Sequence, residues 1–398
     1  MDNYNQIDLD KVKEIVSSYA AIHDSRIFIL NEEVSFNPLE IQRNINETNE
    51  ILKLLKKDIF INFSGIININ DLFVQTKKEI MLSLKDVSDV LNFHNHCKRI
   101  KKILDSIDDE LDIKDYSDSV FVNDNMANEI NRVVDNYGNI KDDASEKLKE
   151  INKKISLNEQ ELNNKSHEFL NRHNNSLQES TIFERNNRIV FLLKNSDKNK
   201  YRGYSYGQSS SGLATYVEPE SFIELNNNKI SFEEEREEEI KHLLMNLTYL
   251  IGSNADYYIN NFNSLLKLDV VYAKAMFGFK NQGIVSTLSD RLYLKDICHP
   301  LIDKDKVVSN TYELKKPYRG IVISGTNTGG KTVGLKTIGL AVLLTYLGIP
   351  VICDQALIPL YDNVFVDIDD NQSISNSLST FSAHISNIND ILNKANSK

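Results

Sequence analysis

Residues 325–332 form a glycine-rich loop of the kind that binds the phosphates of a nucleotide. They match the pattern G-x-x-x-x-G-K-[ST], whose glycines let backbone N–H groups close around phosphate oxygens. In this pattern the lysine reaches the β- and γ-phosphates, and the hydroxyl after it holds Mg²⁺. The sequence therefore predicts a site for ATP or ADP with Mg²⁺, at which Thr332 faces the metal. The eight residues of the loop are Gly325, Thr326, Asn327, Thr328, Gly329, Gly330, Lys331 and Thr332.

The segments on both sides of the loop are predicted to position it. Residues 320–324 are apolar and branched like a buried strand, and an apolar helix is expected from Val333 onward. A helix that begins directly after the loop adds the partial positive charge of its N-terminus to the phosphate site. With the strand-like residues 350–352, this order of elements predicts an α/β domain over residues 285–398.

Hydrolysis of a bound nucleotide also needs a carboxylate that positions the metal. The candidates are Asp367, Asp369 and Asp370, but the stretch before them alternates, whereas such an aspartate normally ends a continuous apolar strand. None of the residues after Asp370 forms an apolar strand that ends in Asp-Glu. We therefore assign no catalytic residue and expect this chain to bind nucleotide with little hydrolysis.

Glycine and proline are rare in the first half of the chain. Of 15 Gly and 6 Pro, only Gly65, Gly138 and Pro38 occur before residue 200. Long helices need such a composition, because an interior glycine costs about 1 kcal/mol and a proline about 3 kcal/mol. The step from Asn37 to Pro38 predicts a helix start, since proline at the first helical position loses only an N–H that has no partner.

Two long amphipathic stretches are predicted to pair as a helical hairpin. Apolar residues recur at steps of three and four over 144–169, where Asn158 is a polar exception, and again over 240–262. We expect the acidic run 233–239 to begin the second helix, where negative charge suits the helix dipole.

The segment between these two helices combines predicted strands with a basic loop. Residues 188–194 are branched and apolar, and 203–219 mix tyrosine, serine and glycine, which predicts short strands at the tip of the hairpin. Tyrosines are interleaved with cations in the loop, a mixture that can neutralise a nucleic-acid backbone and stack on bases. The predicted nucleic-acid contacts are Lys194, Lys198, Lys200 and Arg202.

The composition excludes several classes of protein. A net charge of −11 argues against a generally basic nucleic-acid coat, although not against a local basic groove. The three cysteines are odd in number and widely spaced, which excludes a disulfide framework. The sequence shows no secretory signal and no apolar stretch that could span a bilayer, so we expect a cytoplasmic protein without a membrane partner. His94, His96 and Cys97 are interpreted as surface residues of a helix rather than as half of a metal site.

Taken jointly, several motifs resemble those of the MutS family of ATPases, and specifically its type II branch. The nucleotide loop has the asparagine at its third position and the double glycine of that family's loop. The other segments that carry the resemblance are 209–212, 217–219, 298–301, 307–310, 367–374 and 377–384.

This resemblance implies a multidomain α + α/β fold in which two subunits dimerise head to tail through their ATPase domains. The expected parts are a helical core and lever domain over 1–135, long antiparallel helical arms over 136–265 with a small β-containing clamp at about 180–225, a returning lever helix over 266–284, and the first part of a P-loop ATPase domain over 285–398.

The resemblance also implies roles for residues near the nucleotide. Asn327 and Gln372 would face the phosphates, and Asn310 would lie near the adenosine. Ser379 and Thr380 would contact the nucleotide that is bound to the partner subunit.

The sequence departs from the family pattern in places. Asp369 stands where the family usually has glycine, whose backbone reaches positive φ more readily. The sequence also ends before the strand that should carry the metal-binding Asp and the catalytic Glu. We therefore expect either a chain truncated within the ATPase domain or a degenerate gene product.

Three functions remain open at this point. The first is an ATP-binding, dimeric, nucleotide-gated clamp on branched or structured DNA in repair and recombination; mismatch recognition is not expected, because this branch lacks the mismatch-recognition and connector domains. The second is a ribosome-associated ATPase that rescues stalled or collided ribosomes. The third is a nucleotide-binding scaffold without turnover.

Overall fold

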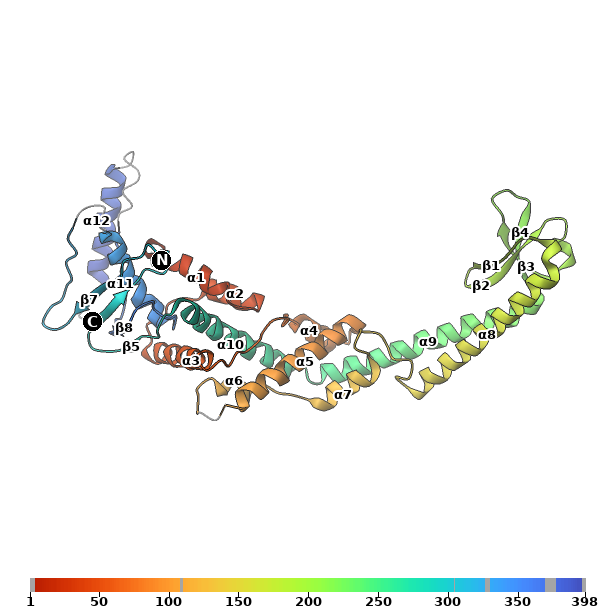
Figure 1. Ribbon diagram of the computed structural model, residues 1–398, viewed down its shortest axis with the longest axis horizontal. Coiled ribbons are helices and arrows are strands. Elements are labelled where there is room, and N and C mark those ends of the chain that lie inside the picture. Colours follow the sequence, from red (N-terminus) through yellow and green to blue (C-terminus); the bar gives the residue numbers. More distant parts are fainter. Residues whose placement is uncertain (1–3, 108–109, 304, 326–329, 369–376, 396–398) are drawn as a thin grey trace. The chain divides into compact units, whose positions relative to one another are not determined.

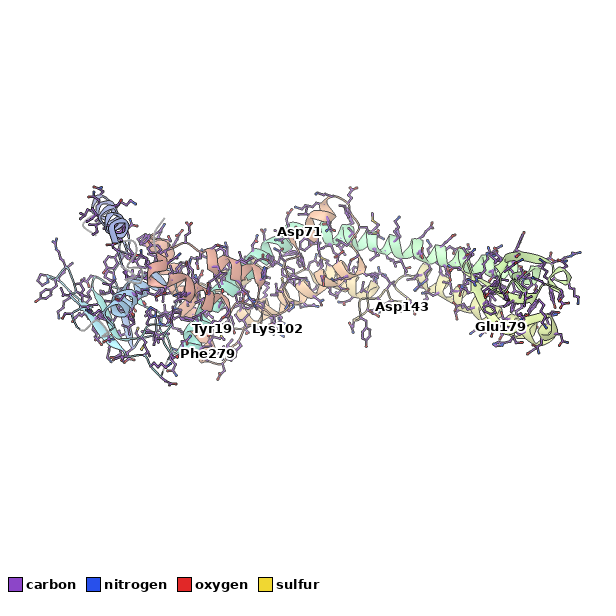
Figure 2. The ribbon with its side chains drawn as sticks, turned by 90° about the horizontal axis from the view of Figure 1, so that it is seen from above. Tyr19, Asp71, Lys102, Asp143, Glu179 and Phe279 are labelled. Atoms are coloured by element: carbon purple, nitrogen blue, oxygen red, sulfur yellow. The ribbon has the colours of Figure 1, made fainter. Side chains whose placement is uncertain are left out.

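The computed structural model of the chain describes residues 4–107, 110–303, 305–325, 330–368 and 377–395, including all their side chains except those of 377–384 and 390. Contacts divide the chain into two compact units, shown in Figure 1 and, with side chains, in Figure 2. The first unit comprises Met1–Asn70, Phe93–Val122 and Asp256–Lys398, and the second comprises Asp71–Asn92 and Asn123–Ala255. The borders of the four domains expected from the sequence stay a prediction.

The first unit combines helices with a four-stranded sheet. The strands are β5 (Thr287–Leu288), β6 (Leu292–Ile297), β7 (Asn310–Leu314) and β8 (Gln355–Ile358), in the order β5-β8-β6-β7. Only β5 and β8 run parallel among these described pairs. The helices are η1 (Tyr4–Ile7), α1 (Leu9–Ser17), α2 (His23–Asn31), α3 (Pro38–Lys56), α6 (Lys114–Ser119), α10 (Ala255–Asn281), α11 (Lys331–Tyr346) and α12 (Ser377–Lys394).

The predicted start of α3 is confirmed. Pro38 is the first helical residue, and the Asn37 side chain accepts a hydrogen bond of 2.9 Å from the backbone N–H of Leu39. This is the capping interaction expected of asparagine before a helix, and it satisfies one of the N–H groups that the first turn leaves without a partner.

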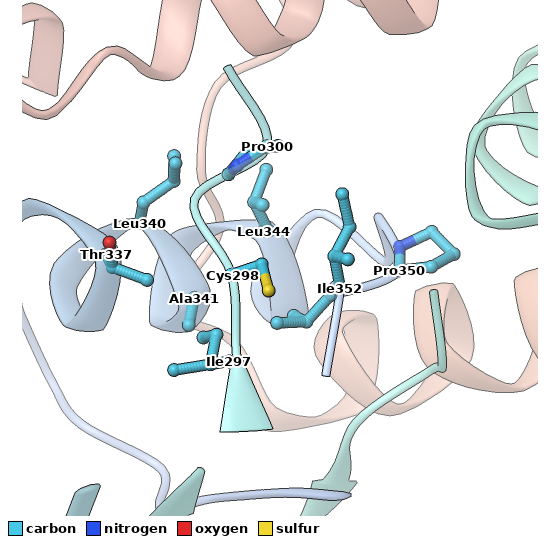
Figure 3. A pocket seen from close by; sticks show the side chains of 10 residues that line it. Ile297, Cys298, Pro300, Thr337, Leu340, Ala341, Leu344, Pro350 and Ile352 are labelled. Carbon is cyan, nitrogen blue, oxygen red and sulfur yellow. The ribbon is translucent and has the colours of Figure 1, made fainter. Parts of the chain in front are cut away.

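Helix α11 lies at the centre of the first unit's apolar core. Its second half is buried against α1, α3 and the sheet, and Leu343 is fully inaccessible to solvent. Figure 3 shows Ala341 of α11 beside Ile297 of β6, and the space left between α11, the end of β6 and residues 350–352 is only about 10 Å³. Such a space holds at most a water molecule, so α11 is tightly packed on the sheet side.

The carbonyl groups at the C-terminal end of α11 all have partners. Gly348 has φ +70° and donates to Thr345 O at 3.0 Å, while Ile349 donates to Leu344 O at 2.8 Å. This pair of bonds is the Schellman arrangement, which needs a residue in the left-handed region and therefore favours glycine.

Side chains from two other helices cap the last carbonyl groups of α11. Asn44 of α3 donates through Nδ2 to Tyr346 O at 3.1 Å, and Lys274 of α10 donates through Nζ to Leu347 O at 2.7 Å. A lysine at this end of a helix also interacts favourably with the helix dipole. The end of α11 is thereby fixed to α3 and α10.

The second unit consists of long helices and a separate antiparallel sheet. The strands are β1 (Leu177–Arg185), β2 (Arg188–Lys194), β3 (Gly203–Gln208) and β4 (Ala214–Pro219), in the order β1-β2-β4-β3. The helices are α4 (Asn70–Lys77), α7 (Asp124–Val133), α8 (Glu146–His173), η2 (Asn174–Ser176), η3 (Lys198–Lys200) and α9 (Glu220–Gly252), and α5 (Leu84–Asp105) runs through both units.

Helices α8 and α9 form an antiparallel pair, with the sheet at one end of it (Figure 1). The prediction of one continuous helix over 240–262 as the partner of α8 was wrong, because α9 ends at Gly252 and a separate helix, α10, begins at Ala255. Lys147 near the start of α8 forms an ion pair of 3.1 Å with Glu239, and Asn158 in the middle donates through Nδ2 to Leu225 O at 3.0 Å. The α9 partner number falls as the α8 number rises, which defines the antiparallel direction. The strands predicted within 188–194 and 203–219 are confirmed.

The predicted start of the second long helix was wrong. Helix α9 begins at Glu220, directly after Pro219, and the acidic run 233–239 lies in its middle. No glycine or proline interrupts residues 220–251, so nothing in the local sequence stops the helix from beginning earlier. Within the run, Glu239 serves the packing of the two helices, because it accepts from Ser145 at 2.8 Å as well as pairing with Lys147.

The strand predicted before the nucleotide loop is also wrong. Residues 320–324 have no regular secondary structure, and the side chain of Val322 is 93% exposed. Residues 350–352 form only an isolated bridge, between Val351 and Ile284. A branched apolar run becomes a strand when neighbouring strands supply hydrogen bonds and cover its faces, and no described strand pairs with 320–324.

We expect Gly348→Ala to destabilise the first unit by about 2–4 kcal/mol, because a Cβ there needs positive φ and would overlap its neighbours. The added atom would lie 2.6 Å from Asn44 O. Urea unfolding followed by circular dichroism measures this loss.

The matched control is Gly339→Ala, inside α11. Its added Cβ meets only the side chain of Ile7, at 3.4 Å from Cδ1 and 3.9 Å from Cγ2, and alanine favours the helix. Equal unfolding midpoints for the two variants would contradict the capping role of Gly348.

Candidate nucleotide and nucleic-acid sites

The described part of the glycine-rich loop lies at the N-terminus of α11. Gly330 precedes the first helical residue with φ +76°, a left-handed conformation that glycine adopts without steric cost. Lys331 donates through Nζ to Gly325 O at 2.9 Å, so its side chain folds back across the loop. Thr332 is exposed, and Thr326, Asn327, Thr328 and Gly329 lie outside the described residues.

A cavity of about 340 Å³ opens beside the first turn of α11. It lies between that turn, the strand β7 and the segment after β6, and Gly330 and Asn310 both contribute to its wall. Asn310 donates through Nδ2 to Val308 O at 3.2 Å. The lining residues are Ile297, His299, Ile302, Lys306, Val307, Val308, Asn310, Tyr312, Gly330, Val333, Gly334 and Thr337.

Two residues of this wall were not found by the sequence analysis. A Cβ on Gly334 would lie 2.5 Å from the hydroxyl oxygen of Tyr312, so a larger residue at this position would displace that side chain. Burial raises the pKa of Tyr312, which therefore offers a neutral hydroxyl to the cavity. A glycine in the second turn of a helix is the signal that could have indicated this contact.

His299 is buried beside the same cavity, with 6% of its surface exposed. Its Nε2 has no hydrogen-bond partner among the described atoms, and Nδ1 accepts from the backbone N–H of Leu301 at 3.4 Å. Burial lowers the pKa of the ring, which favours the neutral form.

Other residues expected near the nucleotide are placed only in part. Gln372, Asp369 and Asp370 lie outside the described residues. Ser379 and Thr380 lie in the first turn of α12, where the side chains are not described. Asp367 accepts through Oδ1 from Asn387 Nδ2 at 2.8 Å.

The interpretation of His94 and Cys97 as surface residues was wrong. Both are buried, and His94 Nδ1 lies 2.7 Å from the hydroxyl of Tyr258. These residues face the core because α5 packs against α10, whose aromatic side chains cover them. Among the described residues no cluster of histidine, cysteine and carboxylate side chains could hold a metal ion.

The basic loop of the second unit lies between β2 and β3, and its cations differ in their surroundings. Lys194 donates through Nζ to Asn175 O at 3.0 Å, and Lys200 forms an ion pair with Asp197. Arg202 is exposed and, like Lys198, has no side-chain partner among the described residues.

A groove of about 590 Å³ brings part of this loop beside the end of α8. Lys200 and Arg202 line it together with Lys165 and Arg172 of α8, which the sequence analysis did not select. The remaining lining residues are Glu168, Phe169, His173, Tyr201, Pro219, Glu220, Ser221 and Phe222. The structure therefore brings together two of the four predicted cations and adds two others; Lys194 and Lys198 lie outside this wall.

Contacts between buried or half-buried side chains of its wall hold the groove in shape. Tyr201 hydroxyl and His173 Nδ1 are 3.0 Å apart, and Lys165 Nζ lies 5.7 Å from the ring centre of Phe222. Glu168 lies 3.4 Å from Arg172 and lowers the positive potential at that side. Of the four cations in the wall, Lys165 and Arg202 are therefore the two without a carboxylate partner among the described residues.

A buried carboxylate fixes the sheet to α9. Glu218 is inaccessible to solvent and accepts from Arg188, Tyr206 and Asn226, each at 2.8 Å. These three donors come from β2, β3 and α9, so one side chain joins three elements. Buried carboxylates are stable only when they are paired and hydrogen-bonded in this way.

No helix in the described part of the chain is long and apolar enough to cross a membrane.

Comparison with known proteins gives a family match and relatives. The family model for MutS domain V matches residues 321–398. A protein named Endonuclease MutS2 from Halothermothrix orenii is 32% identical over 98% of this chain and 51% of its own length. Proteins of the same name are 31% identical in Fusobacterium nucleatum, with 98% and 51% covered, and 38% identical in Thermotoga neapolitana, with 68% and 36% covered. The chain spans about half the length of the curated relatives it matches.

Proposed function

Because this chain belongs to the MutS family, in its type II branch, we propose that it binds ATP or ADP with Mg²⁺ and uses the bound nucleotide to control a grip on DNA. The observation that carries the proposal is the position of Gly330 and Lys331 at the N-terminus of α11, beside a cavity of about 340 Å³. The MutS2 relatives are named as endonucleases, which supports nucleic acid as the polymer that is gripped.

The donor set at the loop fits a phosphate chain with a divalent cation. The first N–H groups of α11 have no partner within the helix and favour an anion. Lys331 Nζ is already held over the loop by Gly325 O, and the exposed Thr332 hydroxyl is available to the metal. In the proposal, Asn327 and Gln372 also face the phosphates.

The cavity beside β7 would take the nucleoside part of the ligand. Its wall combines apolar side chains such as Val307 and Val333 with polar groups, among them Asn310 and Tyr312. In the proposed head-to-tail homodimer, Ser379 and Thr380 of one subunit contact the nucleotide of the other.

We expect Lys331→Ala to weaken binding of MgATP and MgADP by about 10- to 100-fold, because charge-assisted hydrogen bonds to phosphate contribute about 1.5–3 kcal/mol. Titration calorimetry on the whole chain measures the affinity. Lys315→Ala is the control, since Lys315 is exposed, follows β7 and does not line the cavity. An unchanged affinity in Lys331→Ala would contradict nucleotide binding at this loop.

The groove at the end of α8 is the proposed place where DNA phosphates bind. Lys165, Lys200 and Arg202 bring positive charge from two segments to one wall, although the chain as a whole is acidic. Such a local patch attracts a polyanion despite an unfavourable net charge. Branched or structured DNA is the proposed substrate, in a dimer whose α8–α9 pairs act as arms.

Replacing Lys165 and Arg202 together by glutamine is expected to weaken binding to a four-way DNA junction and to flatten its salt dependence. Each lost phosphate contact lowers the slope of log K against log salt by about 0.9 for duplex DNA. Fluorescence anisotropy at several salt concentrations gives both quantities.

The matched control replaces Lys149 and Lys153, which lie on α8 outside the groove, by glutamine. The same slope in both double variants would contradict the groove as the DNA site. Ribosomes added as a competitor test the alternative partner: if they displace the junction through the same two cations and bind more tightly, the ribosome is the better candidate.

A further inference from the structure

The helix that follows the nucleotide loop ends against a buried ammonium group. α11 extends from Lys331 to Tyr346, about 24 Å at 1.5 Å per residue, and Lys274 Nζ caps Leu347 O at 2.7 Å. Lys274 is only 3% exposed, so water does not replace this bond if it is broken. One side chain of α10 therefore holds the end of α11 opposite to the loop.

The same ammonium group also binds α2. Lys274 Nζ donates to Glu32 Oε1 at 2.8 Å, and Glu32 is the residue that directly follows α2. The backbone carbonyl of Glu32 accepts from Lys13 of α1, while its second carboxylate oxygen is buried with no partner among the described atoms. Lys274 is thus the principal counter-charge of a carboxylate that is poorly satisfied without it.

The other end of α2 is held by the same helix, α10. Asp269 is buried and accepts from the backbone N–H groups of Ile22 at 2.9 Å and Ala21 at 3.2 Å, at the start of α2. Helix α2 is therefore fixed to α10 at both ends, by Asp269 and by the Glu32–Lys274 pair. Lys274 links this pair of helices to the C-terminal end of α11, through its hydrogen bond to Leu347 O.

We propose that Lys274 couples the state of the nucleotide loop to α10 and α2; this rests on the proposed binding of nucleotide at the loop. A bound phosphate attracts the N-terminus of α11 and shifts the helix. This shift either separates Leu347 O from the Lys274 ammonium group or moves α10 and α2 together with α11. Separation leaves the buried carbonyl group of Leu347 without this donor and one N–H of the buried ammonium group without this acceptor, which costs free energy for each group. The helices therefore move together.

The space beside the pair permits such a movement. A cavity of about 260 Å³ is lined by Glu32, Lys274 and Lys267, among others. Packed cores resist continuous deformation, but side chains beside a cavity can take a second arrangement without overlapping their neighbours.

Hydrogen exchange of the whole chain, with and without MgADP, tests the coupling. In the unmodified chain we expect slower exchange in the first turns of α11 and also in α2 and the second half of α10. Lys274→Met is expected to keep the nucleotide affinity within about threefold and the protection of α11, while the nucleotide-dependent change in α2 and α10 falls at least fivefold. Lys274→Arg, which keeps the charge and donors, is expected to restore it.

Lys267→Met is the matched control, because Lys267 lies two turns earlier on α10 and lines the same cavity without binding Glu32 or Leu347. If Lys274→Met does not fold, Glu32→Gln provides the test, since it retains a side chain of the same shape but removes the charge; it is expected to reduce the change in α2 more than in α10.

Two results would overturn the coupling while leaving nucleotide binding in place. One is protection of α11 by MgADP without any change in α2 or α10 of the unmodified chain. The other is a change in α2 and α10 that survives in the folded Lys274 or Glu32 variant. No binding of MgADP by the unmodified chain would instead overturn the proposed function, and the coupling with it.

Discussion

The last carbonyl groups of α11 must find donors, because a helix leaves them without intrahelical partners and this helix ends inside the core. Gly348 and Ile349 satisfy two of them from the backbone, while Asn44 and Lys274 satisfy the next two from neighbouring helices. This requirement determines which helices surround α11 and how closely α3 approaches it. The orientation of the nucleotide loop at the other end of α11 depends on the same contacts.

Local signals in the sequence predicted the elements whose structure is decided locally. Asn37 and Pro38 begin α3 because capping needs only adjacent residues, and the spacing of apolar residues in α8 predicted a paired helix. The prediction of a strand at 320–324 was wrong because strand formation depends on neighbouring strands that the local sequence does not specify. The predicted start of α9 was wrong because acidic residues suit a helix N-terminus but are equally compatible with a helix interior that faces cations such as Lys147.

In the candidate sites too, features that are contiguous in the sequence were predicted, and contacts between distant segments were not. The glycine-rich loop could be identified from the sequence because its pattern is contiguous. The contact between Tyr312 and Gly334 was not, because it joins a strand to a helix that lies beyond an intervening loop. Lys165 and Arg172 were missed for a similar reason: they reach the groove from α8, before the strands in the chain, whereas the sequence analysis searched the loop alone.

The hydrogen bond between Asn158 and Leu225 O sets the register of the α8–α9 pair. The side chain is 6% exposed and lies on α8 between the buried apolar residues Ile151 and Leu162, so sliding one helix along the other by a turn would separate the buried amide from its acceptor. An apolar seam alone would tolerate such sliding much better. The polar residue thus gives the pair one preferred alignment along its length, so that the sheet at its end keeps one distance from the start of α8.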